Sequence, residues 1–324
     1  MKNKLLKILY NFKGKKILVI GDIMLDKYIW GDVSRISPEA PVQVVNVLKE
    51  TYEAGGAANV ANNVAALGGL PYMVGISGND EARNVLMEEM RKKCINTGGI
   101  IQDKDKPTTQ KVRIIGKSQQ LLRVDYENKE HIHHDIENSI IKFAEKNINE
   151  VDVVVISDYA KGVITQEVSS KIISLAKQNK KQVIVDPKPK HRNWYIGVDL
   201  ITPNNNEASE MSGIEDGSDE SVIEMGKSIL KNLSTNVLLT KGEKGMSLFE
   251  KDGSVSHIPA KAKEVYSLIG AGDTVVATAA LAIASGADLK EAAFLANIAA
   301  GIKVGKIGTA SVATEEIKAE LENF

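Results

Sequence analysis

A glycine-rich turn that leads into an apolar helix carries the strongest chemical signal in the sequence. It lies within 264–280, which reads EVYSLIGAGDTVVATAA. The backbone N–H groups at a helix start are unpaired, and the helix dipole adds partial positive charge there. Small residues such as Gly270, Ala271 and Gly272 let an anion come close to those groups. The segment is therefore predicted to bind phosphate.

Asp273 follows this turn directly, in the first turn of the predicted helix. A carboxylate beside an anion site is unfavourable unless it takes part in the chemistry. It could accept a proton from an attacking hydroxyl while the N–H groups of 270–273 stabilise a transferring phosphoryl group. Alternatively, Asp273 caps the helix and the glycines only permit close packing. The turn alone does not decide between these roles, and the motifs below favour the catalytic one.

A second glycine-rich segment, AGGAANVANNVAALGG at 54–69, lies far upstream of the first. Together with GAGDT before an Ala-rich helix, it resembles the two motifs of the ribokinase-like (pfkB) carbohydrate kinases, in the family's order. The resemblance implies an ATP-dependent sugar kinase in which Asp273 is the catalytic base. It also places Gly55, Gly56 and Asn59 in contact with the sugar.

The segment GDIMLDKY at 21–28 resembles the opening sugar-binding segment of the same family. Its two acids, Asp22 and Asp26, follow a predicted strand, and ligands bind at the carboxyl ends of strands in open α/β sheets. Carboxylates there can accept hydrogen bonds from sugar hydroxyls. One of the two is expected to cap a turn instead, and Asp26 is the better candidate for sugar contact.

The segment TPNNNE at 202–207 resembles the family's magnesium-organising element. Its Asn204 and Glu207 are three residues apart and would share a face if a helix begins there. Magnesium prefers a few oxygen ligands together with water and substrate phosphates, so a sparse site bound with ATP is expected and no direct protein ligand is assigned. A helix N-cap at Asn204 is the alternative, and both roles are compatible.

Other residues resemble the family's nucleotide site. In TKGEKG at 240–245, Lys241 and Gly242 would lie near the ATP phosphates, beside Thr274 of the GAGDT motif. Asn297 lies on a later Ala-rich helix where the family packs the adenine, although an ordinary surface role is the alternative. Neither GxxxxGK[ST] nor GxGxxG occurs, which disfavours a P-loop kinase and a dinucleotide-binding enzyme.

The whole chain resembles the subfamily that phosphorylates D-glycero-β-D-manno-heptose 7-phosphate. The segments that carry this likeness are SRISPEAPV at 34–42, LLRVDYE at 121–127, SDYAKG at 157–162 and VGKIGTAS at 304–311. The resemblance implies transfer to the anomeric hydroxyl, giving the 1,7-bisphosphate for ADP-heptose and surface polysaccharide synthesis. Many members are fused to a C-terminal nucleotidyltransferase, and the end at Phe324 predicts a stand-alone kinase.

The phosphate already on such a substrate needs a cationic partner far from Asp273. Lys161 is the leading candidate because it follows a buried strand, and Arg35, Arg113 and Arg123 are the others. Each could instead be a solvated surface charge. Two other functions remain open: a kinase for another sugar or sugar phosphate, such as ribose or a fructose phosphate, and a catalytically weak sugar-phosphate sensor.

The chain departs from the family at two positions before the turn. The usual Asp-x-Thr-Gly-Ala-Gly-Asp reads Ser267-Leu268-Ile269 before the Gly-Ala-Gly-Asp here. In ribokinase-like enzymes the missing Asp contributes to a monovalent cation site, so a potassium requirement is uncertain. The change is also the only feature that supports the sensor alternative.

The elements that must position these residues follow from short β-branched runs bounded by turns. These runs lie at 17–20, 151–156, 182–185, 200–201 and 236–239, with helical stretches such as 166–179 and 221–232 between them. Strands buried on both faces and alternating with helices predict one α/β domain over 1–324, with a three-layer, doubly wound, mainly parallel sheet.

Two segments, 31–50 and 107–125, instead alternate apolar with polar residues. This pattern predicts antiparallel strands with one solvated face, which form a small β lid over the mouth of the sheet. An exposed lid sheet has an unpaired edge, and pairing with a second lid would cover it. The lid therefore predicts a homodimer.

Composition excludes several classes of protein. The net charge is −1, with 41 basic and 42 acidic residues, so no general affinity for nucleic acid is expected. A single cysteine, Cys94, rules out an internal disulfide and is expected to be buried, in keeping with a cytoplasmic protein. No apolar run is long enough to span a bilayer, and the N-terminal segment is expected to form an amphipathic helix packed on the domain.

Overall fold

The computed structural model describes residues 2–117, 119–260, 266–306 and 310–323. Parts of two motifs quoted above, 264–265 and 307–309, lie outside the described residues. Within the described ranges, nine strands form the main sheet. In spatial order they are β13 (Val255–Ile258), β12 (Met246–Phe249), β11 (Asn236–Thr240), β10 (Leu200–Ile201), β9 (Gln182–Asp186), β8 (Val153–Ser157), β1 (Lys16–Gly21), β4 (Leu70–Ser77) and β5 (Asn96–Gln102).

Every neighbouring pair from β11 to β5 is parallel, and β12 and β13 add an antiparallel edge. The five runs expected to be strands all belong to the parallel part. Alternation along β1 shows why: Ile17 and Val19 face one hydrophobic core while Leu18 and Ile20 face another. A strand buried on both faces needs helices on both sides of the sheet.

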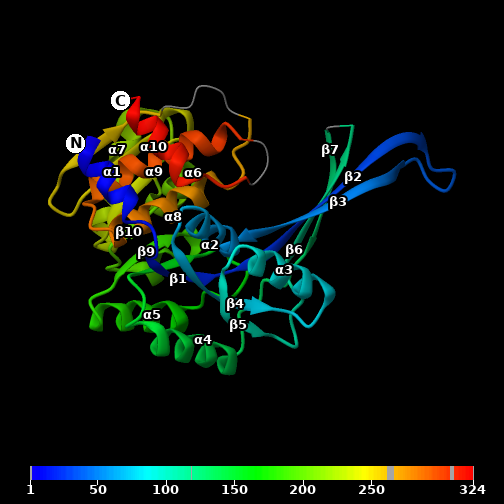
Figure 1. Ribbon diagram of the computed structural model, residues 1–324, viewed down its shortest axis with the longest axis horizontal. Helices are drawn as coiled ribbons and strands as arrows, with labels where there is room; N and C mark the ends of the chain where they lie inside the picture. Colours follow the sequence, from blue (N-terminus) through cyan, green and yellow to red (C-terminus); the bar gives the residue numbers. More distant parts are fainter. Residues whose placement is uncertain (1, 118, 261–265, 307–309, 324) are drawn as a thin grey trace.

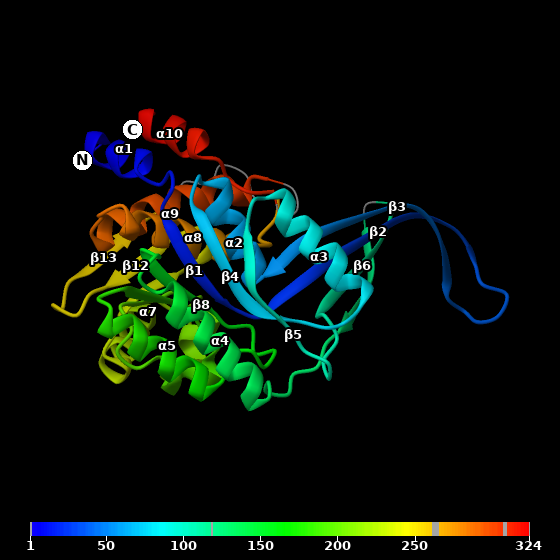
Figure 2. The same cartoon turned by 60° about the horizontal axis from the view of Figure 1, so that its bottom comes forward.

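The helices supply these two outer layers (Figures 1 and 2). One core packs against α1 (Lys2–Tyr10), α2 (Ala57–Ala66), α3 (Glu81–Lys92), α8 (Ala271–Ala284), α9 (Leu289–Val304) and α10 (Thr314–Glu322). The other core packs against α4 (His134–Asn147), α5 (Gln166–Gln178), α6 (Asn205–Ser212) and α7 (Asp219–Leu233). The predicted three-layer α/β fold is confirmed.

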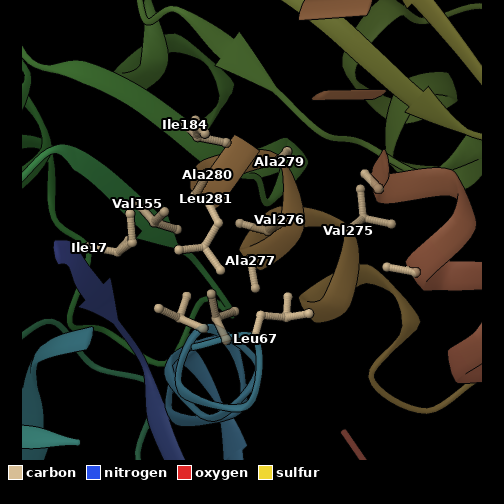
Figure 3. Close-up of a cluster of buried hydrophobic side chains, with 14 of the residues drawn as sticks. Ile17, Leu67, Val155, Ile184, Val275, Val276, Ala277, Ala279, Ala280 and Leu281 are labelled. Carbon is tan, nitrogen blue, oxygen red and sulfur yellow. The ribbon is translucent and has the colours of Figure 1, made fainter. Parts of the chain in front are cut away.

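Helix α8 is buried along most of its length because its side chains are small or β-branched. Figure 3 shows Val276, Ala277 and Leu281 of this helix between the sheet residues Ile17 and Val155 and Leu67 at the end of α2. Tight packing of this kind leaves little freedom for the helix to shift. The first turn of α8, with Asp273, is therefore held by the core.

The second sheet has the order β3 (Gln43–Gly56), β2 (Ile23–Ile36), β6 (Gln110–Gly116) and β7 (Gln119–Tyr126). The β2–β3 and β6–β7 pairs are antiparallel, as expected, and the central β2–β6 pair is parallel. The β2–β3 hairpin extends away from the main body in both views (Figures 1 and 2). Its strands begin closer to the main sheet than predicted, so Asp26 lies within β2 rather than at the end of β1.

Two smaller expectations have different outcomes. Helix α1 buries Leu5, Ile8 and Leu9 and contacts α10, which confirms an amphipathic helix packed on the body. The expected burial of Cys94 is wrong, because this residue is exposed in the turn after α3, with a left-handed φ of 56°. Within the described ranges, no helix combines the length and apolar character that crossing a bilayer requires.

Candidate active site

Asp273 lies at the centre of a hydrogen-bonded group that joins three separate elements. Its Oδ2 accepts a hydrogen bond of 2.6 Å from Nδ2 of Asn59 on α2, and its Oδ1 accepts one of 2.6 Å from the hydroxyl of Tyr159, which follows β8. The side chains of Asp273 and Asn59 are both buried. Two of the residues expected in the site are thus brought together across the chain, and Tyr159 joins them.

The environment of Asp273 favours a carboxylate that can take up a proton. Burial raises the pKa of Asp273, while the hydrogen bonds from Tyr159 and Asn59 lower it. Asp26 raises the pKa further, and Lys303 lowers it. A carboxylate whose pKa lies above the usual range for Asp is a stronger base than an exposed one, and the remaining lone pairs of its oxygens can accept a substrate hydroxyl.

The turn before Asp273 has the geometry of an anion site. Gly270 is the N-cap of α8 and has a left-handed φ of 76°. A Cβ at this position would come within 2.8 Å of Nδ2 of Asn59, so glycine is needed for both conformation and space. Ala271 and Gly272 follow as the first helical residues and line a cavity. The N–H of Ala271 donates to the carbonyl of Leu268 at 3.3 Å, and the next N–H groups, of Gly272 and Asp273, lie at a helix start, where such groups have no partner within the helix.

The carboxylate of Asp22 binds the backbone of a loop and is not turned toward a ligand site. It is buried, and its two oxygens accept hydrogen bonds from the backbone N–H groups of Tyr159 (2.8 Å), Lys161 (3.1 Å) and Val163 (3.0 Å). The expectation that one of the two acids caps a turn is met by this residue. Its role is to hold the loop that carries Tyr159 and Lys161.

A second buried acid anchors the same loop from the opposite side. Asp158 accepts a 2.6 Å hydrogen bond from the N–H of Ala160, and it contacts Nδ1 of His191 at 2.5 Å and the hydroxyl of Tyr195. The last two residues belong to the 3₁₀ helix η1 (Pro189–Tyr195), where the His191 ring stacks on Trp194. Tyr159 is therefore held by buried polar contacts on both sides of the loop.

Asp26 and Arg113 form a nearly buried ion pair at the base of the lid. Their side chains are only 8% and 12% exposed, and the guanidinium also lies over the ring of Tyr28. Gly55 packs against this carboxylate, because a Cβ there would lie 2.3 Å from Oδ2 of Asp26. Gly56 has a φ of 58°, and a Cβ there would lie 2.4 Å from the carbonyl oxygen of Asp22.

Asn204 is the N-cap of α6 and forms a reciprocal capping box with Glu207. The Asn204 side chain accepts from the N–H of Glu207 at 3.0 Å, and the Glu207 side chain accepts from the N–H of Asn204 at 3.1 Å. The capping alternative is therefore present. The other Glu207 oxygen lies 2.5 Å from the ammonium of Lys188.

Asp186, at the carboxyl end of β9, adds a further oxygen donor beside Glu207. Burial raises the pKa of Asp186 well above its usual range, and the negative charges of Glu207 and Asp273 raise it further. Two carboxylates, of Asp186 and Glu207, suit a hard divalent cation that takes its other ligands from phosphate and water. The residues present therefore fit magnesium bound together with a nucleotide.

A cavity of about 370 Å³ lies beside the turn. Its lining consists of β11 and its following loop, the start of α8 and the end of α9: Thr240, Gly242, Glu243, Gly245, Met246, Ala260, Leu268, Ala271, Gly272, Val275, Asn297, Ala300, Gly301 and Val304. Small and apolar side chains of this kind leave room for a flat base. Gly242 and Asn297 are here as expected, and the Asn297 amide donates to the carbonyl of Pro259 at 2.8 Å.

Two residues of the expected nucleotide set have other surroundings. Lys241, the N-cap of the short 3₁₀ helix η2 (Gly242–Lys244), lines a second cavity together with Lys244 and His257. Thr274 is fully buried, and its hydroxyl donates to Oδ1 of Asn63 at 3.1 Å and to the carbonyl of Gly270 at 3.0 Å. Thr274 therefore ties α8 to α2 and does not line the cavity.

The expected phosphate-binding cations are only partly gathered. Lys161 pairs with Glu127. Burial raises the pKa of Glu127, but the contacts with Lys161 and Lys129 outweigh burial and lower this pKa to about 2. Lys111 of β6 lies close by: burial lowers its pKa, and the positive charge of Lys161 lowers it further. Arg123 is exposed and pairs with Asp125, while Arg35 is exposed near the turn of the hairpin that extends from the body.

Sequence reasoning missed several residues of this site. Tyr159 lies in SDYAKG, which was noted only for its lysine, and the DPK run at 186–188 directly follows a predicted strand, the same signal that identified Asp22. Lys111 had no signal beyond its place in a lid strand. Three histidines, His131, His133 and His134, lie at or just before the start of α4, and within the described residues no group of three or more His, Cys, Asp or Glu is placed to hold a metal ion.

Replacing Tyr159 by Phe is expected to shift the acidic side of the pH–rate profile upward. The Tyr159 hydroxyl lowers the pKa of Asp273, so its loss raises that pKa, and the base becomes protonated at a higher pH. The profile of kcat/KM between pH 5 and pH 9 tests this, because it reports the free enzyme. An acidic limb that stays in place, or moves to lower pH, would show that this hydroxyl does not act on the base.

A family model described as pfkB family carbohydrate kinase matches residues 14–316 of this chain. Curated relatives named bifunctional protein HldE are 42% identical to it. The protein of Desulfatibacillum aliphaticivorans aligns over 96% of this chain and 64% of its own length, and that of Geobacter sulfurreducens over 94% and 62%. The chain thus spans less than two thirds of the relatives it matches.

Solved structures show the same fold at lower identity. A ribokinase of Arabidopsis thaliana, solved with ribose and ATP, superposes with a TM-score of 0.74 at 20% identity, covering 96% of this chain and 99% of that one. Phosphofructokinase-2 of Escherichia coli, solved with potassium, gives a TM-score of 0.77 at 20% identity with the same coverage. These similarities establish the fold.

Proposed function

Because this chain belongs to the pfkB family of carbohydrate kinases and is an ATP-dependent sugar kinase, we propose that it phosphorylates the anomeric hydroxyl of D-glycero-β-D-manno-heptose 7-phosphate. The observation that carries the mechanism is the position of Asp273, with both oxygens hydrogen-bonded, directly after the anion-binding turn. The identity of 42% to proteins named HldE supports the heptose substrate.

The reaction needs a sugar hydroxyl, a γ-phosphate and a base along one line. ATP is expected in the cavity between the β11 loop and α9, with its γ-phosphate at the N–H groups of 270–273. The sugar would lie at the base of the lid, where Asp26, Gly55 and Asn59 are gathered. Asp273 then lies between the two ligands.

In the proposed step the anomeric oxygen attacks the γ-phosphorus and its proton passes to Asp273. The new O–P bond forms as the bond to the β–γ bridging oxygen breaks, and ADP leaves. The N–H groups at the start of α8 stabilise the charge on the transferring group. Magnesium, when bound with ATP, would neutralise phosphate charge, and Asp186, Asn204 and Glu207 are the residues placed to hold it with its waters.

The 7-phosphate of the sugar would bind to the lysines on the loop and the lid. Lys161 pairs with Glu127, and its positive charge acts on Lys111 of the lid. A substrate phosphate can compete with Glu127 for this ammonium, because a phosphate carries more negative charge than a carboxylate. Sugars without that phosphate would leave Lys161 paired with Glu127 and would gain no binding energy from this lysine.

A panel of acceptors tests the proposed substrate. Purified protein with Mg-ATP is expected to release ADP and form the bisphosphate from the heptose 7-phosphate much faster than from fructose 6-phosphate, ribose or no sugar. In Lys161→Met the KM for the heptose phosphate is expected to rise about 10- to 100-fold through loss of a charge-assisted hydrogen bond. Lys129→Met, which removes the exposed partner of the same Glu127, is the matched control and should change little.

Each other outcome of the panel has a distinct meaning. Turnover with only another sugar would keep the kinase mechanism and overturn the heptose substrate. Tight sugar-phosphate binding with no turnover of any acceptor would favour the sensor alternative. An unchanged KM in Lys161→Met would move the phosphate subsite elsewhere in the lid.

We also propose that the lid forms a homodimer. Leu122, Val124 and Tyr126 alternate along β7, an edge strand of the lid sheet, so they share one face, and all three are exposed. An unpaired edge with apolar side chains is stabilised by pairing with a second copy. Sedimentation equilibrium is expected to give the dimer mass for the wild type and the monomer mass for Val124→Glu, whereas a concentration-independent monomer mass for the wild type would contradict the proposal.

A further inference from the structure

A fully buried lysine lies beside the anion-binding turn. Lys303, in the last turn of α9, has no exposed surface. A Cβ built on Gly270 would lie 3.5 Å from Cε of Lys303 and 3.7 Å from Oδ2 of Asp273, so the end of the lysine side chain reaches the backbone at the head of α8. Burying an ammonium costs several kcal/mol unless other groups compensate for it.

The charges around Lys303 come from both sides of the active site. Burial lowers the pKa of Lys303, and Glu53 and Asp273 act in the opposite direction. Glu53 lies in β3 at the base of the lid. Burial raises the pKa of Glu53, and the negative charge of Asp26 raises it further, whereas the positive charge of Lys303 lowers it. The ammonium thus lies within electrostatic reach of acids on α8 and on the lid.

The segment in which this chain departs from its family packs on the same helix end. The N–H groups of Tyr266 and Ser267 donate to the carbonyl of Val304, the residue after Lys303, at 2.8 and 3.2 Å. The N–H of Ile269 is satisfied locally by the hydroxyl of Ser267 at 3.3 Å. Ser267 is therefore hydrogen-bonded to the C-terminal end of α9, and the Asp usual at this position would lie beside the same helix end.

In the part of this region that the structure describes, 266–306, the residues beside Ser267 lack the carboxylate of a monovalent cation site. Such an ion is held by oxygen ligands that replace its hydration shell. Here the carboxylate usual at position 267 is absent, and Lys303, the residue before the Val304 that Ser267 contacts, carries a buried ammonium of the same charge sign, which would repel such an ion in a medium of low dielectric constant. Phosphofructokinase-2, the neighbour solved with potassium, shares only the fold with this chain.

We propose that Lys303 is a positioning residue whose fixed charge supports the anion-binding turn in place of a bound monovalent cation, so that phosphoryl transfer by this chain does not depend on potassium. The ammonium lies beside the turn and adds to the positive end of the α8 dipole that faces the phosphate. The inference rests on the proposed use of this turn for the γ-phosphate.

The test compares monovalent cations and variants with the best acceptor found for the enzyme. The wild type is expected to keep its kcat, within about twofold, when potassium is replaced by tetramethylammonium, an ion too large for a tight oxygen cage. Lys303→Met is expected to lose at least about tenfold in kcat, with a smaller change in sugar KM, as for loss of an electrostatic contact to the transition state. Lys303→Arg, which keeps the charge, should recover part of the rate.

Two further readouts separate an electrostatic role from a structural one. Because Lys303 lowers the pKa of Asp273, the acidic limb of the pH–rate profile should move upward in Lys303→Met. In the triple variant Lys303→Met/Ser267→Asp/Ile269→Thr, potassium should restore activity that tetramethylammonium does not. Lys290→Met, an exposed lysine on the same helix, is the matched control and should match the wild type.

Strong activation of the wild type by potassium, or full activity of Lys303→Met in tetramethylammonium, would overturn the proposal. If no acceptor is turned over, the proposed function is wrong, but this result leaves the role of Lys303 to a second measurement. Calorimetry of Mg-ATP binding then decides that role. The expected result is one wild-type Kd in both cations and weaker binding by Lys303→Met. A Kd that improves several-fold in potassium for the wild type would exclude the proposed role, and a melting temperature for each variant identifies any that fail to fold.

Discussion

Asp273→Asn is expected to lower kcat by about 10²- to 10⁴-fold, the usual contribution of a positioned general base. Asparagine keeps the shape of the side chain but cannot take up the hydroxyl proton at neutral pH. The helix and the glycine turn do not depend on the charge, because Gly270 is the N-cap of α8. The KM for ATP and the melting temperature are therefore expected to change little. ADP release under saturating substrates measures the effect.

Asp288→Asn provides the matched control for this substitution. Asp288 is the N-cap of α9, where its side chain accepts from the N–H of Glu291, and asparagine caps a helix about as well as aspartate. Activity of this variant should equal that of the wild type. Retention of more than about a tenth of the wild-type kcat in Asp273→Asn would assign the proton transfer to another group.

Arg113→Met is expected to destabilise the protein by about 3 kcal/mol, the lower end of the cost of leaving a buried partner charge uncompensated. The pair with Asp26 is nearly buried, and the guanidinium also packs over Tyr28, so no water replaces the lost partner easily. Sugar binding should weaken as well, because Asp26 loses the group that orients its carboxylate. Urea unfolding, followed by fluorescence, measures the midpoint shift at constant slope.

The lid offers a control of the same chemistry at its surface. Arg123 pairs with Asp125 on β7, but its side chain is 49% exposed, and such pairs contribute less than about 1 kcal/mol. Arg123→Met should therefore leave the unfolding midpoint close to that of the wild type. In Asp26→Asn/Arg113→Met much of the lost stability should return, since no buried charge remains. Equal effects of the two arginine substitutions would mean that Asp26 is hydrated in solution.

Much of the fold follows from local sequence patterns. The β-branched runs identified the five central parallel strands, because a strand buried on both faces has no polar alternation. Strands β4 and β5 and the antiparallel edge of β12 and β13 were not predicted. Their patterns are shorter or mixed with glycine and polar residues, and strand pairing supplies what the local signal lacks. The lid was predicted from alternation, but its true length depends on pairing with β6.

The candidate site divides in the same way. Residue chemistry identified Asp273, the glycine turn and the acids near β1 as candidates, and the resemblance to the kinase family added Asn59. The distinct roles of Asp22 and Asp26 depend on which partners the fold provides: three backbone N–H groups for the first and Arg113 for the second. Lys241 and Thr274 have partners that motif likeness alone did not indicate.

The sequence by itself determined the class of fold through hydrophobic periodicity and the family through its glycine-rich motifs, and it made Asp273 the candidate base, because such signals act through neighbours in the chain. Only the tertiary structure decided which groups surround that base. Tyr159, Asn59 and Lys303 come from segments far apart in sequence, and their hydrogen bonds and charges act on Asp273 through space. Long-range contacts of this kind leave no periodic signal, since they arise only when the packed core brings the ends of separate elements together.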